Sequence, residues 1–154
     1  MQERVWILGG SESSTLLNTT SFLFLNGSTA VGPLLPKSLE KHCVTWASSK
    51  SSKVVLLGGQ DYTNQYLAHT YIYDFEAENL GWTRGPEMLQ KRSRFGCASF
   101  YDTSRQTEVL VSVGGYDLSG LGYHSSIEWV ETNSLEKGIW SYGTNSTLKF
   151  QAGL

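Results

Sequence analysis

The sequence predicts an all-β protein built from repeated antiparallel units. A Gly-Gly pair ends a short apolar run three times, in VWILGG, VVLLGG and VLVSVGG, and the second glycines lie 49 and 56 residues apart. Short runs of strand-forming residues follow one another about every 10 to 15 residues, and no stretch keeps the 3.6-residue period of a helix. A repeat of this length is typical of an array of small sheets.

The second unit, residues 42–86, is the most regular. Strands are expected at 42–47, 54–57, 70–75 and 81–84. The run at 54–57 is continuously apolar and bounded by glycine, which favours a strand that is buried on both faces. Polar or glycine-containing turns join each strand to the next, so the unit is predicted to be a four-stranded antiparallel meander.

Two other units have the same order of elements. In the third unit, 95–145, strands are expected at 95–101, 108–113, 125–131 and 139–142, and in the first unit, 1–33, at 4–8, 20–25 and 28–31 only. Residues 146–154 are interpreted as a tail. Small sheets bury their faces by stacking, and radial closure of such a stack gives a β-propeller. Two complete units and part of another predict a fragment of such a ring, whose exposed end faces favour self-association. Assembly of several copies into a ring is the alternative.

The motif residues that follow each glycine pair also recur. An aromatic residue lies 14 residues after each second glycine, at Phe24, Tyr73 and Trp129, and these three are expected to be equivalent. A Trp with Gly three residues later follows in the second and third units, at Trp82 and Trp140, whereas the first unit has Thr29 there.

This pattern resembles the kelch repeat, and the resemblance extends from Val5 to about Asn145. It implies a kelch-type β-propeller segment in which the motif residues are scaffold. In the intracellular branch of that family it would imply an adaptor that recruits protein partners. The structural motif residues are Gly9, Gly10, Gly58, Gly59, Tyr73, Asp74, Trp82, Gly114, Gly115, Trp129 and Trp140.

The two cysteines, Cys43 and Cys97, are interpreted as buried thiols of the core. They occupy nearly the same place in successive units, and equivalent strands of neighbouring units are expected to lie beyond the roughly 7 Å between Cα atoms that a disulfide tolerates.

Composition narrows the classes of function. The formal charge of −2 and the pI near 5.9 give no electrostatic signature of a nucleic-acid-binding protein. No apolar run reaches the roughly 18 residues of a membrane helix, and the first residues do not read as a signal peptide. Three Asn-x-Ser/Thr sequons, at Asn18, Asn26 and Asn145, favour an extracellular or lumenal protein.

Catalysis is not expected. His42, His69 and His124 occur singly, without the paired spacing of metal sites, and no motif of a nucleophile or a phosphate loop is present. We therefore predict a protein that is not an enzyme and has neither cofactor nor metal. The alternative, implied by the resemblance, is a divergent segment of a kelch-propeller enzyme such as a copper oxidase with a Cys–Tyr cross-link.

Protein binding is the favoured function. Loops 11–19, 60–68 and 116–124, together with 34–41 and 87–94, are expected to emerge on one side of the stack. Rigid β-scaffolds often display function on loops, and Tyr and Arg dominate protein-recognition hot spots. The sequence does not name the protein partner. The candidate binding residues are Tyr62, Tyr66, Arg92, Tyr116, Tyr123 and His124.

Overall fold

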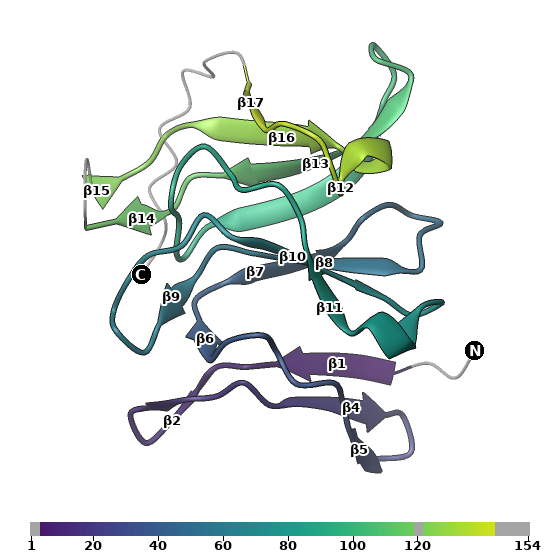
Figure 1. Ribbon diagram of the computed structural model, residues 1–154, viewed down its shortest axis with the longest axis vertical. Helices are drawn as coiled ribbons and strands as arrows, with labels where there is room; N and C mark the ends of the chain where they lie inside the picture. The colour runs from purple at the N-terminus through teal and green to yellow at the C-terminus, as the bar shows by residue number, and fades with distance from the viewer. Residues whose placement is uncertain (1–3, 119–121, 144–154) are drawn as a thin grey trace.

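The computed structural model describes residues 4–118 and 122–143 and shows an all-β protein made of small antiparallel sheets. Three main sheets lie one above another along the long axis of the molecule (Figure 1). Their strand orders are β1-β4-β5, β11-β10-β8-β7 and β12-β13-β16-β17. Within each main sheet, the strands lie side by side in the order in which they occur in the sequence, as predicted for a meander.

The expected strands are present, and most of their ends differ from the prediction by one or two residues. The first sheet contains β1 (Arg4–Leu8), β4 (Thr20–Phe24) and β5 (Thr29–Val31). The second contains β7 (Cys43–Trp46), β8 (Lys53–Leu57), β10 (Thr70–Asp74) and β11 (Trp82–Arg84). The third contains β12 (Gly96–Asp102), β13 (Thr107–Val113), β16 (Ile127–Glu131) and β17 (Ser141–Tyr142).

Short elements occupy the connections. Three two-stranded pairs are formed by β2 (Ser11–Glu12) with β3 (Thr15–Leu16), β6 (Leu39–Glu40) with β9 (Gln60–Asp61), and β14 (Tyr116–Asp117) with β15 (Gly122–Tyr123). Two single turns of 3₁₀ helix, η1 (Glu78–Leu80) and η2 (Thr132–Ser134), follow β10 and β16.

The core lies between the sheets. Val55, Leu57 and Ile72 of the second sheet pack with Leu110 and Val130 of the third, and all five side chains are at most 2% exposed. The apolar run at 54–57 is buried on both faces, as predicted, because a sheet packs against each side of β8.

An aromatic layer joins the first sheet to the second. The Trp6 ring lies 5.3 Å from Phe22 in its own sheet, and 5.4 and 5.5 Å from Tyr73 and Trp82 in the next. Aromatic contacts of this kind bury large areas and add about 0.5–1.5 kcal/mol for each pair.

The glycine pairs have one shared backbone conformation. The second glycines, Gly10, Gly59 and Gly115, have φ of +102°, +94° and +102°, in a region that side chains disfavour. A Cβ atom on Gly59 would lie 2.8 Å from the Glu40 carbonyl oxygen, and one on Gly115 would lie 2.8 Å from the Phe95 Cβ. Glycine is therefore required at Gly59 and Gly115, where the segment that enters the same sheet passes close to the glycine pair.

The predicted equivalence of Phe24, Tyr73 and Trp129 is wrong by one residue in two of the three sheets. In the ladders, Leu8 pairs with Thr20, Leu57 with Thr70 and Val113 with Ile127. Counting from these pairs places Leu23, Tyr73 and Val130 at equivalent positions. The loop after the glycine pair gains one residue in each successive unit, and a shift of one residue turns a side chain to the other face of a strand.

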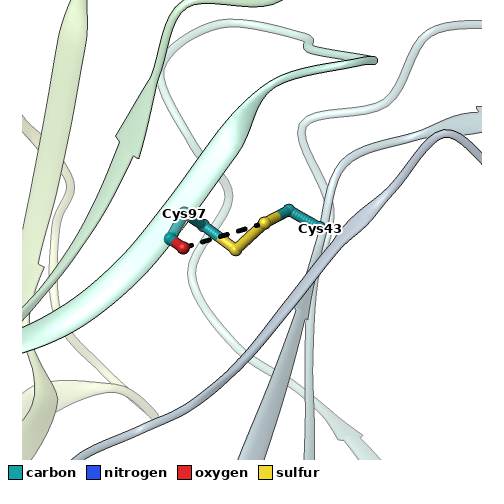
Figure 2. Close-up of a disulfide and its surroundings, with 2 residues drawn as sticks. All are labelled: Cys43 and Cys97. Atoms are coloured by element: carbon teal, nitrogen blue, oxygen red, sulfur yellow. Dashed lines mark hydrogen bonds between the residues drawn. A yellow bond between two sulfur atoms is a disulfide. The ribbon is translucent and has the colours of Figure 1, made fainter.

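The cysteine prediction is also wrong, because Cys43 and Cys97 form a disulfide with 6.0 Å between their Cα atoms (Figure 2). Cys43 pairs with Leu57, whereas Cys97 pairs with Ser112, which is one position earlier in its sheet than the counterpart of Leu57. This offset turns the two side chains toward each other. Their strands, β7 and β12, are adjacent first strands of the second and third sheets, where the sheets approach closely.

Candidate functional site

The connecting loops gather along one edge of the stack. Figure 1 shows β2, β6, β9, β14 and β15 along the left edge of the molecule, where the predicted loops emerge. We call this edge the loop face and define it by residues 11–19, 34–41, 60–68, 87–94, 116–118 and 122–124. The turns that join β7 to β8 and β12 to β13 lie at the opposite edge (Figure 1).

Backbone hydrogen bonds hold these loops in a repeated arrangement. The second glycine of the first pair donates its N–H to the Leu39 carbonyl at 2.9 Å, and Gly59 donates to the Arg92 carbonyl at 2.7 Å. Ser93 and Tyr116 form an isolated β-bridge, which ties the last of these incoming segments to β14. Such ladders order the loops before any partner binds, and a partner then loses less entropy on binding.

Three of the predicted tyrosines form a cluster on the loop face. Tyr116 and Tyr123 are opposite each other in the β14–β15 hairpin, with ring centroids 5.0 Å apart. The Tyr66 ring lies 5.8 Å from Tyr116, edge to face. Tyr123 is 73% exposed, while Tyr66 and Tyr116 are half-buried. Burial raises the pKa of Tyr66, so its hydroxyl keeps its proton and donates or accepts hydrogen bonds at neutral pH.

Tyr62 lies apart from this cluster, in the loop that follows β9, and is 73% exposed. It borders a groove of about 440 Å³ between the β2–β3 hairpin and that loop. The groove is polar, with lining residues Ser11, Ser14, Thr15, Leu16, Glu40, Asp61, Tyr62 and Asn64.

Asp61 fixes the loop that carries Tyr62. Burial alone would raise the pKa of Asp61, but hydrogen bonds from Lys37, from the Thr63 hydroxyl and from the backbone N–H groups of Thr63 and Gln65 lower it to about 2. The Lys37 Nζ lies 2.7 Å from the carboxylate. The loop is therefore held by a charged, almost fully buried group.

The structure corrects the prediction for Arg92, whose side chain is inside the protein with 0% exposure. Its Nε and Nη2 donate to the buried Glu128 carboxylate at 3.2 and 2.7 Å. Nη1 donates to the carbonyls of Gly114 and Ser126. Arg92 therefore anchors its loop to the third sheet and is not a surface contact.

His124 is likewise mostly interior, at 8% exposure. Its Nε2 donates to the Lys91 carbonyl at 3.1 Å. Burial and the nearby Arg92 charge lower the pKa of His124, so the ring is neutral at pH 7. Its role in the structure is to join two loops, and a partner reaches little of its side chain.

Two features of this surface were missed by the sequence prediction. Lys91 and Leu118 are exposed, and together with Asn64, Gln65 and Tyr66 they line a shallow pocket of about 250 Å³. The basic run from Lys91 to Arg94 was the available signal for Lys91. Successive side chains of an extended segment point in opposite directions, so a buried Arg92 places the Lys91 side chain on the surface.

The predicted glycosylation sites differ in their exposure. Asn26 is exposed in the turn between β4 and β5, and its Oδ1 accepts from the Ser28 backbone N–H at 3.0 Å and from the Ser28 hydroxyl at 2.7 Å. Asn18 is half-buried. Asn145 lies outside the described residues.

The titratable residues are dispersed. Within residues 4–118 and 122–143, no group of three or more His, Cys, Asp or Glu comes together as a metal site would require. Burial lowers the pKa of His42 and of His69, and the His69 Nδ1 lies 3.2 Å from the Tyr71 hydroxyl. None of the helical turns in the same ranges has the length and apolar character needed to cross a membrane.

A scan against models of protein families finds no match to this chain, and a search of curated proteins finds none either.

Proposed function

We propose that this chain is a segment of a kelch-type β-propeller and that its loop face binds a protein partner without catalysis. The observation that carries the proposal is the tyrosine surface: Tyr66, Tyr116 and Tyr123 are in ring contact, and Tyr62 lies exposed on the loop that also carries Tyr66. Tyrosine supplies a large contact area with few rotatable bonds and a polar hydroxyl, which suits it to protein recognition.

The kelch assignment is supported by repetition in three dimensions. Trp82 and Trp140 occupy matching places. Trp82 pairs with Tyr73. Ser141 pairs with Trp129, so Trp140, one residue earlier, is in register with Val130, the counterpart of Tyr73. The Gly32, Gly85 and Gly143 N–H groups donate to the Thr20, Thr70 and Ile127 carbonyls in the same way. These contacts agree with a scaffold role for the motif residues.

The alternative of a copper oxidase gains no support from the cysteines. A Cys–Tyr cross-link uses a free thiol, and the only two cysteines of the chain are joined to each other. A disulfide in a chain of this size also favours an oxidising compartment, which agrees with the proposal of an extracellular or lumenal protein.

Glycosylation at Asn26 belongs to the same proposal. Its sequon is exposed, whereas the Asn18 sequon includes Thr20, which is 2% exposed and donates its hydroxyl to the Pro33 carbonyl. Secretion of the full chain from eukaryotic cells should give a glycosidase-sensitive mass shift that is smaller by one glycan in Asn26→Gln. A shift that persists unchanged in this variant would count against the assignment.

The binding function can be tested with a random peptide library displayed on phage and selected on the immobilised full chain. Binding of the selected peptides should fall at least tenfold in Tyr62→Ala, Tyr66→Ala and Tyr123→Ala, since hot-spot tyrosines contribute about 2 kcal/mol each. Tyr101→Ala is the matched control, because Tyr101 is 51% exposed at the end of β12, by the opposite edge. Peptides whose binding depends on Tyr101 and not on the other three would contradict the proposal.

A further inference from the structure

Each main sheet has two faces that differ in what they contact. We call the face that contains Trp6 and Phe22 in the first sheet, and Val55 and Ile72 in the second, the trailing face. The opposite face, which contains Tyr73 in the second sheet, is the leading face. The ladders define these sets, because Trp6 pairs with Phe22 and Val55 with Ile72, whereas Tyr73 pairs with Val54 and Trp82.

The two interfaces inside the chain follow one rule. The trailing face of the first sheet packs against the leading face of the second, where Trp6 contacts Tyr73 and Trp82. The trailing face of the second sheet packs in turn against the leading face of the third, where Val55 and Ile72 meet Leu110 and Val130. A trailing face therefore meets a leading face both times.

One leading face and one trailing face remain exposed at the two ends of the stack. The leading face of the first sheet carries exposed apolar side chains, with Val5 57%, Ile7 53%, Leu23 38% and Val31 86% exposed. The register places all four on the same side, since Val5 pairs with Leu23 and Ser21 pairs with both Ile7 and Val31.

The trailing face of the third sheet is the complement. Phe100 is 49% exposed there, and the Arg105 guanidinium lies 4.2 Å from the centre of the Trp129 ring. The same arrangement occurs at an interface inside the chain. The Arg4 guanidinium lies 4.2 Å from Phe22, the counterpart of Trp129, and 5.2 Å from Phe75 of the next sheet. The counterpart of Phe75 in the first sheet is Leu25, which is 79% exposed.

We propose that a second copy of this chain covers these faces, with the trailing face of the third sheet of one copy packed on the leading face of the first sheet of the next. The contact continues the interface that the chain already uses twice, and it brings Trp129 and Arg105 against Leu23 and Leu25. It is heterologous, so growth continues head to tail until a ring closes or a filament forms. The inference rests on sheet packing alone and is independent of the proposed binding function.

The test is sedimentation velocity on the full chain over a hundredfold range of concentration. The mean mass should rise with concentration, and Ile7→Lys and Phe100→Lys should each weaken association at least tenfold. Val31→Lys is a second variant of the leading face, and all three residues are exposed enough to leave the far-ultraviolet circular dichroism unchanged. Tyr62→Lys, on the loop face, is the control that should associate like the unaltered chain.

Mixing the variants identifies the mode of contact. Ile7→Lys keeps an intact trailing face and Phe100→Lys keeps an intact leading face, so an equimolar mixture should form a dimer that grows no further. A chain that stays monomeric over the whole concentration range would overturn the proposal. Association that Ile7→Lys abolishes and Phe100→Lys leaves unchanged would overturn it as well, because it would mean that two first sheets contact each other.

Discussion

Replacement of Glu128 by Gln should destabilise the protein strongly, because this carboxylate is the partner of a buried Arg. Glu128 and Arg92 are both 0% exposed. The carboxylate accepts from the Leu89 and Gln90 backbone N–H groups at 2.6 and 3.0 Å, and from Arg92 at 3.2 and 2.7 Å. A Gln amide would remove the negative charge and turn a donor toward other donors.

The magnitude follows from the uncompensated charge. Removing one partner of a buried ion pair costs about 3–5 kcal/mol, whereas replacing both by apolar groups of similar volume is often neutral. The second sheet and the segment that precedes it offer that replacement, because Leu39 and Tyr71 occupy the places of Arg92 and Glu128 and belong to one buried cluster. The double variant Arg92→Leu/Glu128→Tyr should therefore recover part of the stability that Glu128→Gln loses, and not all of it, because the Leu89 and Gln90 backbone N–H groups lose their acceptor.

Urea unfolding followed by tryptophan fluorescence measures these free energies. Glu87→Gln is the control, since Glu87 forms an exposed ion pair with Arg84, and exposed pairs contribute about 1 kcal/mol or less. A loss below about 1 kcal/mol in Glu128→Gln, or a double variant less stable than the single one, would refute the reasoning.

Three further outcomes can be measured by the same unfolding assay. Cys43→Ala/Cys97→Ala should lower the free energy of unfolding by about 4 kcal/mol, because the disulfide joins residues 54 apart in the chain and cross-links that close long loops restrict the unfolded state most; equal stability would contradict this. Gly59→Ala should lose more stability than Gly10→Ala, since both have positive φ but only the Cβ at Gly59 meets other atoms within 4 Å; similar losses, near the roughly 1–2 kcal/mol of backbone strain alone, would refute it. The folded-state pKa of Asp61 is about 2, below its ordinary value of 3.8, so the carboxylate contributes about 2 kcal/mol above pH 4, and this contribution is lost as the pH falls from about 4 to 2. The difference between the protein and Asp61→Asn should therefore shrink across that range, and a constant difference would contradict the assignment.

The strands could be predicted from sequence because their signals are local. A glycine-bounded apolar run such as 54–57 has few alternatives to a buried strand, and its length sets the ends to within a residue or two. The equivalence of Trp82 and Trp140 could also be predicted, because each Trp is followed by a Gly at the same distance of three residues, Gly85 and Gly143.

The errors concern geometry that depends on loop length. One additional residue between a glycine pair and the next strand displaced Trp129 from the position predicted for it. The same kind of offset turned Cys43 and Cys97 toward each other. Counting along a chain does not show which face a side chain occupies once loops of unequal length intervene.

The burial of Arg92 had a signal that the prediction did not use. Glu128 lies in the middle of a predicted strand, at the place that Tyr71 occupies in the second unit, and a carboxylate there requires a buried partner. The basic segment before β12 is the nearest source of one. A charged residue at a core-facing position of a repeat, such as Glu128, thus predicts a buried residue of opposite charge nearby, here Arg92.

The most direct test of the central claim is an amide hydrogen-exchange footprint of the full chain with a library-selected peptide bound. If the loop face is the binding surface, protection should appear in residues 60–68, 116–118 and 122–124, and exchange in the turns at 47–52 and 103–106 should stay unchanged. Protection confined to those two turns, with none around Tyr66 and Tyr123, would contradict the account.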